Sequence, residues 1–293
     1  MKAREIFLSV ISWLALAIIL LGVSSLVVFL FMRGAGSLNA NLFFGNTPAF
    51  DAIFALKPVW SGIWPAVAGS LLLLLVTMII AIIPGISCGV YLACFASVRE
   101  KNYISTCVDV LAGIPSIVMG LFGLELIIVL RKTFLPQGNT CLLLAAFCLA
   151  ILVLPTLIVS VRSSIEALPS RLTLTANALG MSHSQCVKNV LIPIAMPGIL
   201  GGVILSMGRA MEDTAVIMLT GAVANAGLPA GLGAKFEALP FRIYYTAAQY
   251  TSQEELARGF GTALLLLLCS WALILLARIF QAHLTRKWEG VKS

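Results

Sequence analysis

Apolar residues in this chain gather into long runs separated by shorter polar stretches. A helix that crosses the hydrocarbon core of a bilayer needs about 20 predominantly apolar residues. Six runs reach that length, and they predict transmembrane helices at approximately 6–32, 66–97, 109–130, 141–161, 197–221 and 259–282. The second run contains Pro84-Gly85, so we expect it to be kinked or tilted. The pattern predicts an all-α fold with one transmembrane domain over residues 1–293.

Lysines and arginines at the ends of these runs predict the orientation, because cytoplasmic loops carry an excess of both. With the N-terminus in the cytoplasm, the inner segments hold Lys2, Arg4, Arg99, Lys101, Arg162, Arg171, Lys188, Arg278, Arg286, Lys287 and Lys292. The outer segments hold Arg33, Lys57, Arg131, Lys132, Lys235, Arg242 and Arg258. The bias favours two cytoplasmic termini, which agrees with six spans, although Arg131-Lys132 goes against it.

The composition narrows the class of protein. Hydrophobic residues make up 60% of the chain and charged residues 11%, whereas about a quarter of a soluble domain is charged. The net charge of +7 is scattered between apolar runs, which argues against nucleic acid as a partner. The seven cysteines form no C-x-x-C pair, so we predict no metal site. Phosphate-binding P-loops and common hydrolase motifs are absent from the sequence, and we predict that the chain is not an enzyme.

Three charges interrupt the fifth apolar run: Arg209, Glu212 and Asp213. Each charge near the bilayer centre costs about 2.5–3.5 kcal/mol on insertion scales, so such residues usually face a protein interior or a water-filled path. On a continuous helix Arg209 would lie within pairing reach of both acids. The cluster therefore indicates the route of a hydrophilic solute, or else an internal ion pair that braces the bundle.

The predicted inner loop, 162–196, has the pattern of two short helices joined at a glycine. Ser170 can begin a helix that stops at Gly180, and a second amphipathic helix can run from Ser182 to Leu191. Such a pair held close to the membrane suits docking into the groove of a partner protein. It suits packing on the protein's own helices equally well, and the residue pattern alone does not choose between them.

This loop resembles the coupling segment of ABC-transporter permeases, E-A-A-x-x-x-G-x9-I-x-L-P. Aligned on Gly180, the segment matches at Ala176 and Pro193, with Val190 and Ile192 as conservative replacements. Leu174 stands where the family has its acidic residue, and Thr175 replaces the first alanine. The resemblance implies that Ala176, Gly180, Val190, Ile192 and Pro193 serve the contact with an ATPase.

Two further stretches resemble the phosphate-specific permeases of this class. Residues 111–124, LAGIPSIVMGLFGL, are similar to the signature of the third helix, with Met119 in place of the usual tyrosine. Residues 209–215 are similar to R-A-x-G-E-T-A-P, with Glu212 for glycine, Asp213 for glutamate and then Val216 for proline. The resemblance covers about 66–283 and is greatest to the PstA-type subunit.

The resemblance implies a subunit of an ATP-driven phosphate importer in a bacterial-type cytoplasmic (inner) membrane. It implies cytoplasmic ATPase subunits that use ATP, a second homologous permease subunit, an extracytoplasmic phosphate-binding protein and membrane lipid as partners. This chain itself would bind no cofactor. Other readings remain open: the same machinery for molybdate, tungstate or phosphonate, an ion-coupled secondary transporter, or a membrane sensor or scaffold that transports nothing.

Within that scheme the candidate pathway residues are Arg209, Asp213, Glu212, Ser116 and Thr214. Arg209 offers five donors in a rigid fork that matches a tetrahedral oxyanion. Asp213 would hold Arg209 between passages, or would accept a hydrogen bond from protonated phosphate, and we favour the first. Whether Glu212 faces the pathway is left open. Ser116 and Thr214 either line the path or bond local carbonyl groups, as hydroxyls within helices often do.

Overall fold

The computed structural model describes residues 2–45, 47–53, 59, 62–134 and 136–289, and it is all-α, as the sequence predicts. Lys57 and Lys292, used above to predict orientation, lie outside these residues. The elements are α1 (Lys2–Gly34), η1 (Ala35–Ser37), α2 (Ala40–Phe44), α3 (Ala49–Ile53), α4 (Trp64–Cys94), α5 (Val98–Ala112), α6 (Ser116–Thr133), α7 (Leu142–Glu166), α8 (Arg171–Ala178), α9 (His183–Cys186), η2 (Val187–Leu191), α10 (Ile192–Glu212), α11 (Ala215–Thr220), α12 (Leu239–Gln249) and α13 (Gln253–Glu289).

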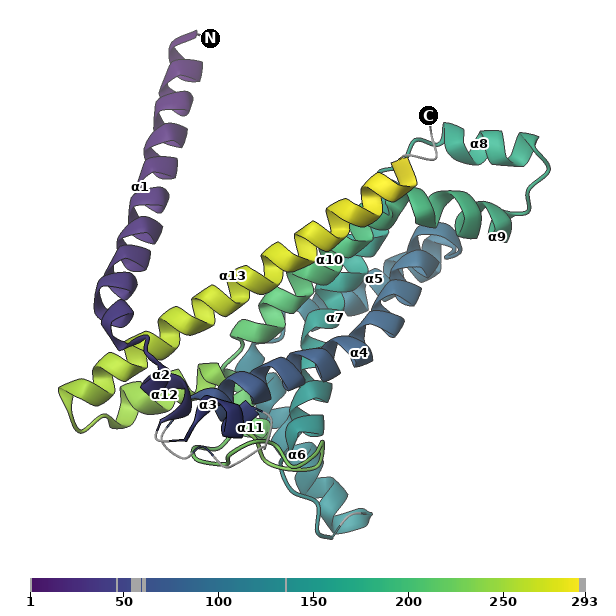
Figure 1. Ribbon diagram of the computed structural model, residues 1–293. Coiled ribbons are helices and arrows are strands. Elements are labelled where there is room, and N and C mark those ends of the chain that lie inside the picture. The colour runs from purple at the N-terminus through teal and green to yellow at the C-terminus, as the bar shows by residue number, and fades with distance from the viewer. Residues whose placement is uncertain (1, 46, 54–58, 60–61, 135, 290–293) are drawn as a thin grey trace.

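Five stretches of helix in the described residues are long and apolar enough to cross a membrane. They are α1, α4, α7, the continuous helix His183–Glu212 and α13, and the bent pair α5–α6 makes a sixth span if it is counted as one. Figure 1 shows both termini at the end of the molecule that carries α8, with α2, α3 and α12 at the opposite end. This arrangement agrees with the predicted even number of crossings.

The segment predicted as one helix over 109–130 is instead broken. α5 ends at Ala112 and α6 begins at Ser116, and their axes are bent by 93°. Pro115 has extended backbone dihedrals and no N–H to donate, and its ring disfavours helical geometry at the residue before it. The helical run also starts earlier than predicted, at Val98, because Ser97 and Glu100 form a capping box there.

The fifth predicted span, 197–221, also differs from one simple helix. Its helix begins in the predicted inner loop, since α9, the π-helical turn η2 and α10 run on without a break from His183 to Glu212. The wide η2 turn ends at Leu191, two residues before Pro193, which cannot donate a backbone hydrogen bond. The helix then stops at Asp213, whose backbone is extended, and α11 starts at Ala215.

Helix α7 is the centre of the bundle. Two thirds (67%) of its apolar window is buried, compared with none (0%) of that of α1, whose C-terminal end packs on α13 while its N-terminal part stands away from the bundle in Figure 1. Glycines bring α4 and α10 close to α7: a β-carbon would lie 2.6 Å from Val161 Cβ if added at Gly89, and 2.5 Å from Ser160 Cβ if added at Gly202. Because lipid is as apolar as the side chains, such close packing of small residues is what holds transmembrane helices together.

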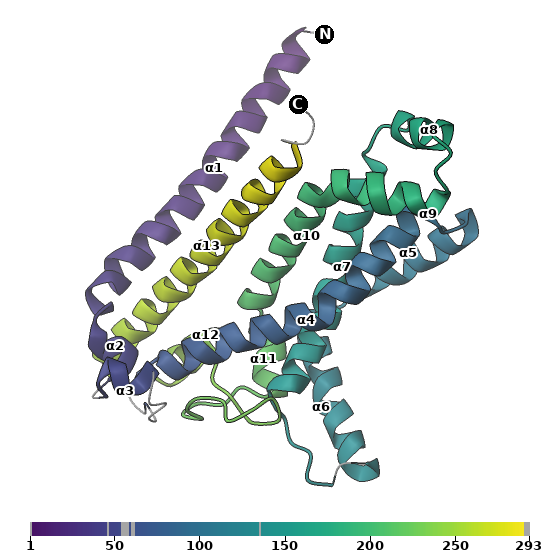
Figure 2. The ribbon, with the colours of Figure 1, turned by 45° about the vertical axis from the view of Figure 1, so that its right-hand side comes forward.

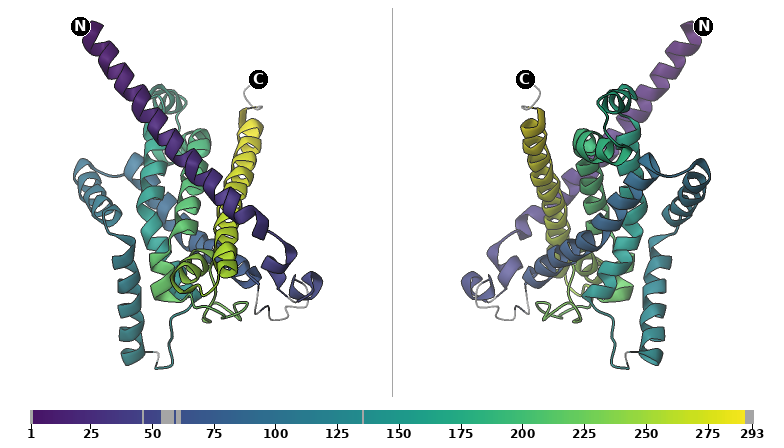
Figure 3. Two further views of the ribbon diagram at one scale, coloured as in Figure 1. Left: turned by 90° about the vertical axis from the view of Figure 1, so that its left-hand side faces the viewer. Right: turned by 90° about the vertical axis from the view of Figure 1, so that its right-hand side faces the viewer.

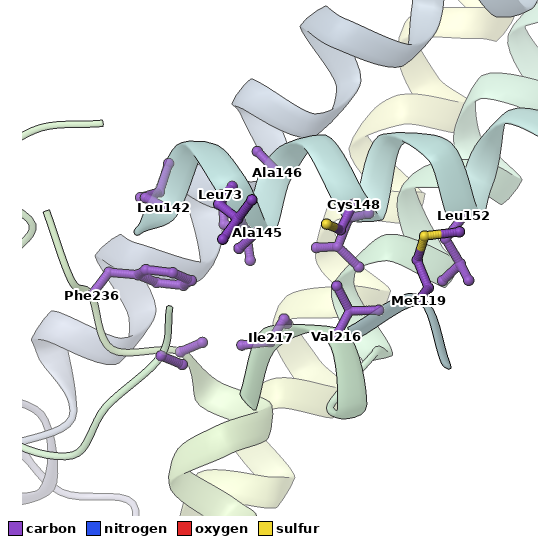
Figure 4. Close-up of a cluster of buried hydrophobic side chains, with 14 of the residues drawn as sticks. Leu73, Met119, Leu142, Ala145, Ala146, Cys148, Leu152, Val216, Ile217 and Phe236 are labelled. Atoms are coloured by element: carbon purple, nitrogen blue, oxygen red, sulfur yellow. The ribbon is translucent and has the colours of Figure 1, made fainter. Parts of the chain in front are cut away.

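A cluster of buried side chains joins α7 to the elements near the end of the bundle that carries α12. Figure 4 shows Leu142, Ala145, Cys148 and Leu152 of α7 facing Met119, Val216, Ile217 and Phe236. The loop that contains Phe236 runs back to the start of α7, where Leu232 O and Ala234 O accept hydrogen bonds from Leu143 N and Leu142 N. The cluster therefore fixes α6, α11 and this loop around one end of α7.

The close contact of α10 with α7 yields a prediction about stability. A side chain at Gly202 would overlap Ser160, so we expect Gly202→Ala to destabilise the protein by about 1–3 kcal/mol. Thermal unfolding in detergent should show the loss as a lower midpoint. The neighbouring Gly201→Ala is the matched control, since its β-carbon would meet nothing closer than Gln281 Nε2 at 3.9 Å. Equal midpoints for the two variants would contradict the packing argument.

Candidate functional site

A groove runs between α10 and α13, with a volume of about 1080 Å³. Its walls carry Gly201, Ile204, Leu205, Gly208, Arg209, Glu212, Ile274, Arg278, Gln281 and Ala282. The two helices that form it are visible side by side in Figures 1 and 2. An apolar groove with a few charged side chains, formed by two membrane-spanning helices, is a candidate path for a charged solute.

Arg209 projects from α10 at mid-depth in the bundle. Its Nη1 donates to Thr156 Oγ1 at 3.0 Å, and Thr156 stands ten residues before the last residue of α7. Ten residues of helix measure about 15 Å, which is half the hydrocarbon thickness of a typical bilayer. Within the described part of the chain the guanidinium makes no other hydrogen bond and no ion pair. Four of its five donors are therefore free to bind a ligand.

Asp213 does not pair with Arg209, and the expected ion pair is wrong for this structure. The ion pairs among described residues join Lys101 and Arg162 to Glu166, and Arg242 to Glu237. Asp213 Oδ1 instead accepts a hydrogen bond from Val216 N at 2.8 Å and so caps the start of α11. A short acidic side chain that bonds the nearby backbone competes with the helix, which is why the chain leaves helical geometry at this residue.

The other predicted pathway residues divide between two places. Glu212, whose orientation the sequence left open, is exposed and lines the groove with Arg209. Ser116 and Thr214 stand at the starts of α6 and α11, outside the groove lining. These two starts belong to neighbouring helices, because a β-carbon at Gly120 of α6 would lie 3.0 Å from Ala215 O of α11.

The predicted coupling segment forms a compact unit at the end of the bundle that carries the termini (Figure 1). α8 ends before Gly180, whose φ of +76° is the left-handed value that favours glycine. Ala176 is buried with Cys186 and Leu191, while Val190 and Ile192 pack against the same cluster. Two large apolar side chains stay exposed: Leu174 and Leu179 have 67% and 73% of their surface accessible. Pro193, half-buried, stands in the first turn of α10.

The match to a family model decides the class of this protein. The model for "binding-protein-dependent transport system inner membrane component" matches residues 85–290, which include the groove and the coupling segment. The chain belongs to this family. It is therefore a permease subunit of an ABC importer and a multi-pass membrane protein.

Individual relatives agree with this assignment. The permease is 35% identical over 160 residues to the probable ABC transporter permease protein YqgI of Bacillus subtilis, an alignment that covers about half of each protein (54% and 53%). It is 31% identical to the phosphate transport system permease protein PstA 1 of Mycobacterium tuberculosis, over 77% of this chain and 72% of that one. Against PstC 1 of the same organism the identity is 28%, over 64% and 62%.

A solved structure shows the same fold. A chain of the MetNI methionine ABC transporter, in an inward-facing conformation, superposes with a TM-score of 0.59. The superposition covers 76% of the permease and 97% of that chain, at 18% sequence identity. At this identity the likeness concerns the arrangement of helices alone.

His183 is a contact residue of the coupling segment that the sequence did not reveal. Its Nε2 donates to Cys94 O, the last residue of α4, at 2.8 Å, and its ring packs edge-on against Phe95 with 5.1 Å between centroids. The carbonyl is an obligate acceptor, so the bonded nitrogen carries the proton. Since residues 94 and 183 are far apart in sequence, a lone histidine carried no signal of this link. It ties the start of α9 to the end of α4.

At the opposite end of the permease, Glu237 organises the loop before α12. Its side chain is buried, Oε1 accepts from Gly227 N at 3.1 Å, and Oε2 lies 3.7 Å from Arg242 Nη1. Burial raises the pKa of this carboxyl, and the Gly227 hydrogen bond and the Arg242 charge oppose that shift. The loop is thus held by a buried acid and its arginine partner.

The capping role of Asp213 can be separated from a role for its charge. Asparagine keeps the Oδ1 acceptor, so we expect Asp213→Asn to retain both thermal stability and ATP-driven transport. Asp213→Ala removes the cap and should cost about 1 kcal/mol. Thermal unfolding in detergent and transport in proteoliposomes measure the two effects. Complete loss of transport in a stable Asp213→Asn variant would show instead that the charge is essential.

Proposed function

We propose that this permease moves inorganic phosphate across the cytoplasmic membrane, driven by ATP that separate subunits hydrolyse. The observation that carries the proposal is Arg209: a mid-membrane guanidinium with four free donors, facing an open groove. A rigid fork of donors matches the oxygen atoms of phosphate. The PstA relative supports phosphate as the particular oxyanion.

Glu212 gives the groove a means of telling phosphate from sulfate. It lies three residues beyond Arg209 on α10 and lines the same groove. A carboxylate accepts hydrogen bonds and repels a fully ionised anion. The P–O–H group of monoprotonated phosphate can donate a hydrogen bond to Glu212 while Arg209 donates to the other phosphate oxygens; fully ionised sulfate has no hydrogen bond to donate. The same carboxylate also weakens the net attraction of the groove for the anion. Weak attraction allows the rapid release that a transport path requires.

The coupling segment is where ATPase subunits would dock. Leu174 and Leu179 expose apolar surface at the end of the bundle away from α12, and an exposed apolar patch marks a contact surface. The shape of the segment depends on five of its residues: Ala176, Gly180, Val190, Ile192 and Pro193. In this proposal that end is cytoplasmic, both termini lie in the cytoplasm, and ATP binds to the partner subunits. No cofactor is proposed for the permease itself.

Two further partners complete the proposed importer. The groove between α10 and α13 is open along one side, so a second permease subunit is needed to enclose the path; the resemblance to PstC 1 supports such a pairing. An extracytoplasmic phosphate-binding protein would deliver its ligand to the opposite end of the bundle. At that end η1, α2, α3 and α12 form a cap on the bundle (Figure 3).

Reconstitution tests the substrate and the energy source together. The permease, assembled with its ATPase and partner permease in proteoliposomes that receive the binding protein, should take up labelled phosphate only when ATP is supplied. Equimolar sulfate should leave the rate unchanged. Uptake driven by an ion gradient without ATP would identify a secondary transporter, and stronger competition by molybdate, tungstate or a phosphonate would transfer the assignment to that oxyanion.

Arg209 is tested in the same system. Arg209→Ala removes the mid-membrane donors and should reduce phosphate uptake at least about 100-fold, the effect of losing charged hydrogen bonds to the anion. Assembly, measured by copurification of the ATPase, should persist. Arg99→Ala, at an exposed arginine outside the groove, is the matched control and should transport normally. Normal uptake by assembled Arg209→Ala would disprove the role.

A further inference from the structure

A second arginine shares the groove with Arg209. Arg278 projects from α13 into the lining, opposite the wall formed by α10. Its guanidinium makes no hydrogen bond or ion pair with any residue that the structure describes. The sequence treated it as one of the basic residues that orient the last helix. The structure adds that it faces the same space as the candidate substrate residue.

The packing of α10 on α13 sets the depth of Arg278. The helices are antiparallel: Gly208 faces Ile274, with 3.7 Å from a β-carbon to Ile274 Cδ1, and Gly201 faces Gln281. In this register Arg278 stands opposite residue 204, five residues along α10 from Arg209. Five residues of helix measure about 7.5 Å. Arg278 therefore lies about 7.5 Å closer than Arg209 to the end that carries the coupling segment.

The charged residues of the groove consequently form an ordered series. Glu212 is three residues of α10, or about 4.5 Å, on the far side of Arg209. From the outer end to the inner end the order is Glu212, Arg209 and Arg278. An anion at Arg209 has a carboxylate behind it and a free guanidinium ahead of it. The field along the groove draws the anion toward the end with the coupling segment.

We propose that Arg278 is a second oxyanion-binding position, which receives phosphate from Arg209 on the inner side of the pathway; this rests on the proposed function. A single deep arginine in a site of low dielectric would hold the anion and slow its release. A second guanidinium, about one and a half helical turns away, offers hydrogen-bond donors to the anion before the anion leaves Arg209. Because the anion passes directly from one weak binding position to the next, protein groups donate hydrogen bonds to it throughout the crossing.

The experiment must separate this role from simple anchoring of α13 by a charge near the membrane surface. Arg278→Gln removes the charge. The double variant Arg278→Gln with Ile279→Arg keeps a positive charge at the same depth but turns it about 100° round the helix, to an exposed position outside the groove. Arg278→Lys keeps the charge in the groove. ATP-driven phosphate uptake, ATPase activity and copurification of the ATPase are measured for all three in the complete importer.

We expect Arg278→Gln and the double variant to lose about tenfold or more in maximal phosphate uptake, with assembly and binding-protein-stimulated ATPase activity retained. Arg278→Lys should recover part of the rate. Normal uptake by Arg278→Gln, or recovery of uptake by the double variant, would overturn the proposal, the latter by assigning Arg278 to anchoring. If the wild-type importer moves a different oxyanion, phosphate is wrong as the proposed substrate. Uptake of that oxyanion by the same variants then decides the role of Arg278.

Discussion

Close packing of α4 and α10 against α7 is the constraint on which the rest of the permease depends. Gly89 and Gly202 meet Val161 and Ser160 so tightly that no side chain fits at either glycine. In lipid this close approach, rather than hydrophobic burial, holds the helices together. It also sets their register, and the register places Arg209 opposite Thr156 at mid-depth. Without the glycine contacts the arginine would have neither its depth nor its hydrogen bond to Thr156.

The two helix breaks depend on the same core. A bilayer tolerates irregular backbone only where protein or a water-filled cavity surrounds it. The break at Pro115 and the break at Asp213 are followed by α6 and α11, which pack on each other and on α7 in the cluster of Figure 4. Asp213 satisfies a free N–H of α11 with its own carboxylate. The acid that the family pattern places beside the arginine therefore has a structural use here, and the arginine stays free for a ligand.

Apolar run length sufficed to predict the five long apolar helices, and Gly180 and Ser182 sufficed for the turn in the coupling segment, because these signals are local. The break at Pro115 was missed, although its signal is local too, since a proline disfavours helix at the residue before it. The predicted ion pair between Arg209 and Asp213 was wrong because the prediction assumed that one helix continues through Asp213. In the structure the helix stops at Asp213, which caps α11. Arg278 could not be recognised at all: its place in the groove follows from the contact of α13 with α10, which no local pattern records.

One wall of the groove and the second half of the coupling segment lie on one continuous helix. From His183 to Arg209 the helix is continuous, a length of about 40 Å, so a displacement of α9 reaches the arginine without passing through a loop. At one end His183 donates a hydrogen bond to the last carbonyl of α4; midway, Gly202 packs against α7.

The π-helical turn η2 and Pro193 lie between these two contacts and lack part of the regular hydrogen-bond ladder. Bending is therefore easiest there, between the predicted coupling surface and the part of α10 that carries Arg209. A movement of α8 and α9 that pivots at η2 would swing the groove wall formed by α10 against α13, and it would alter the spacing of Arg209 and Arg278 directly.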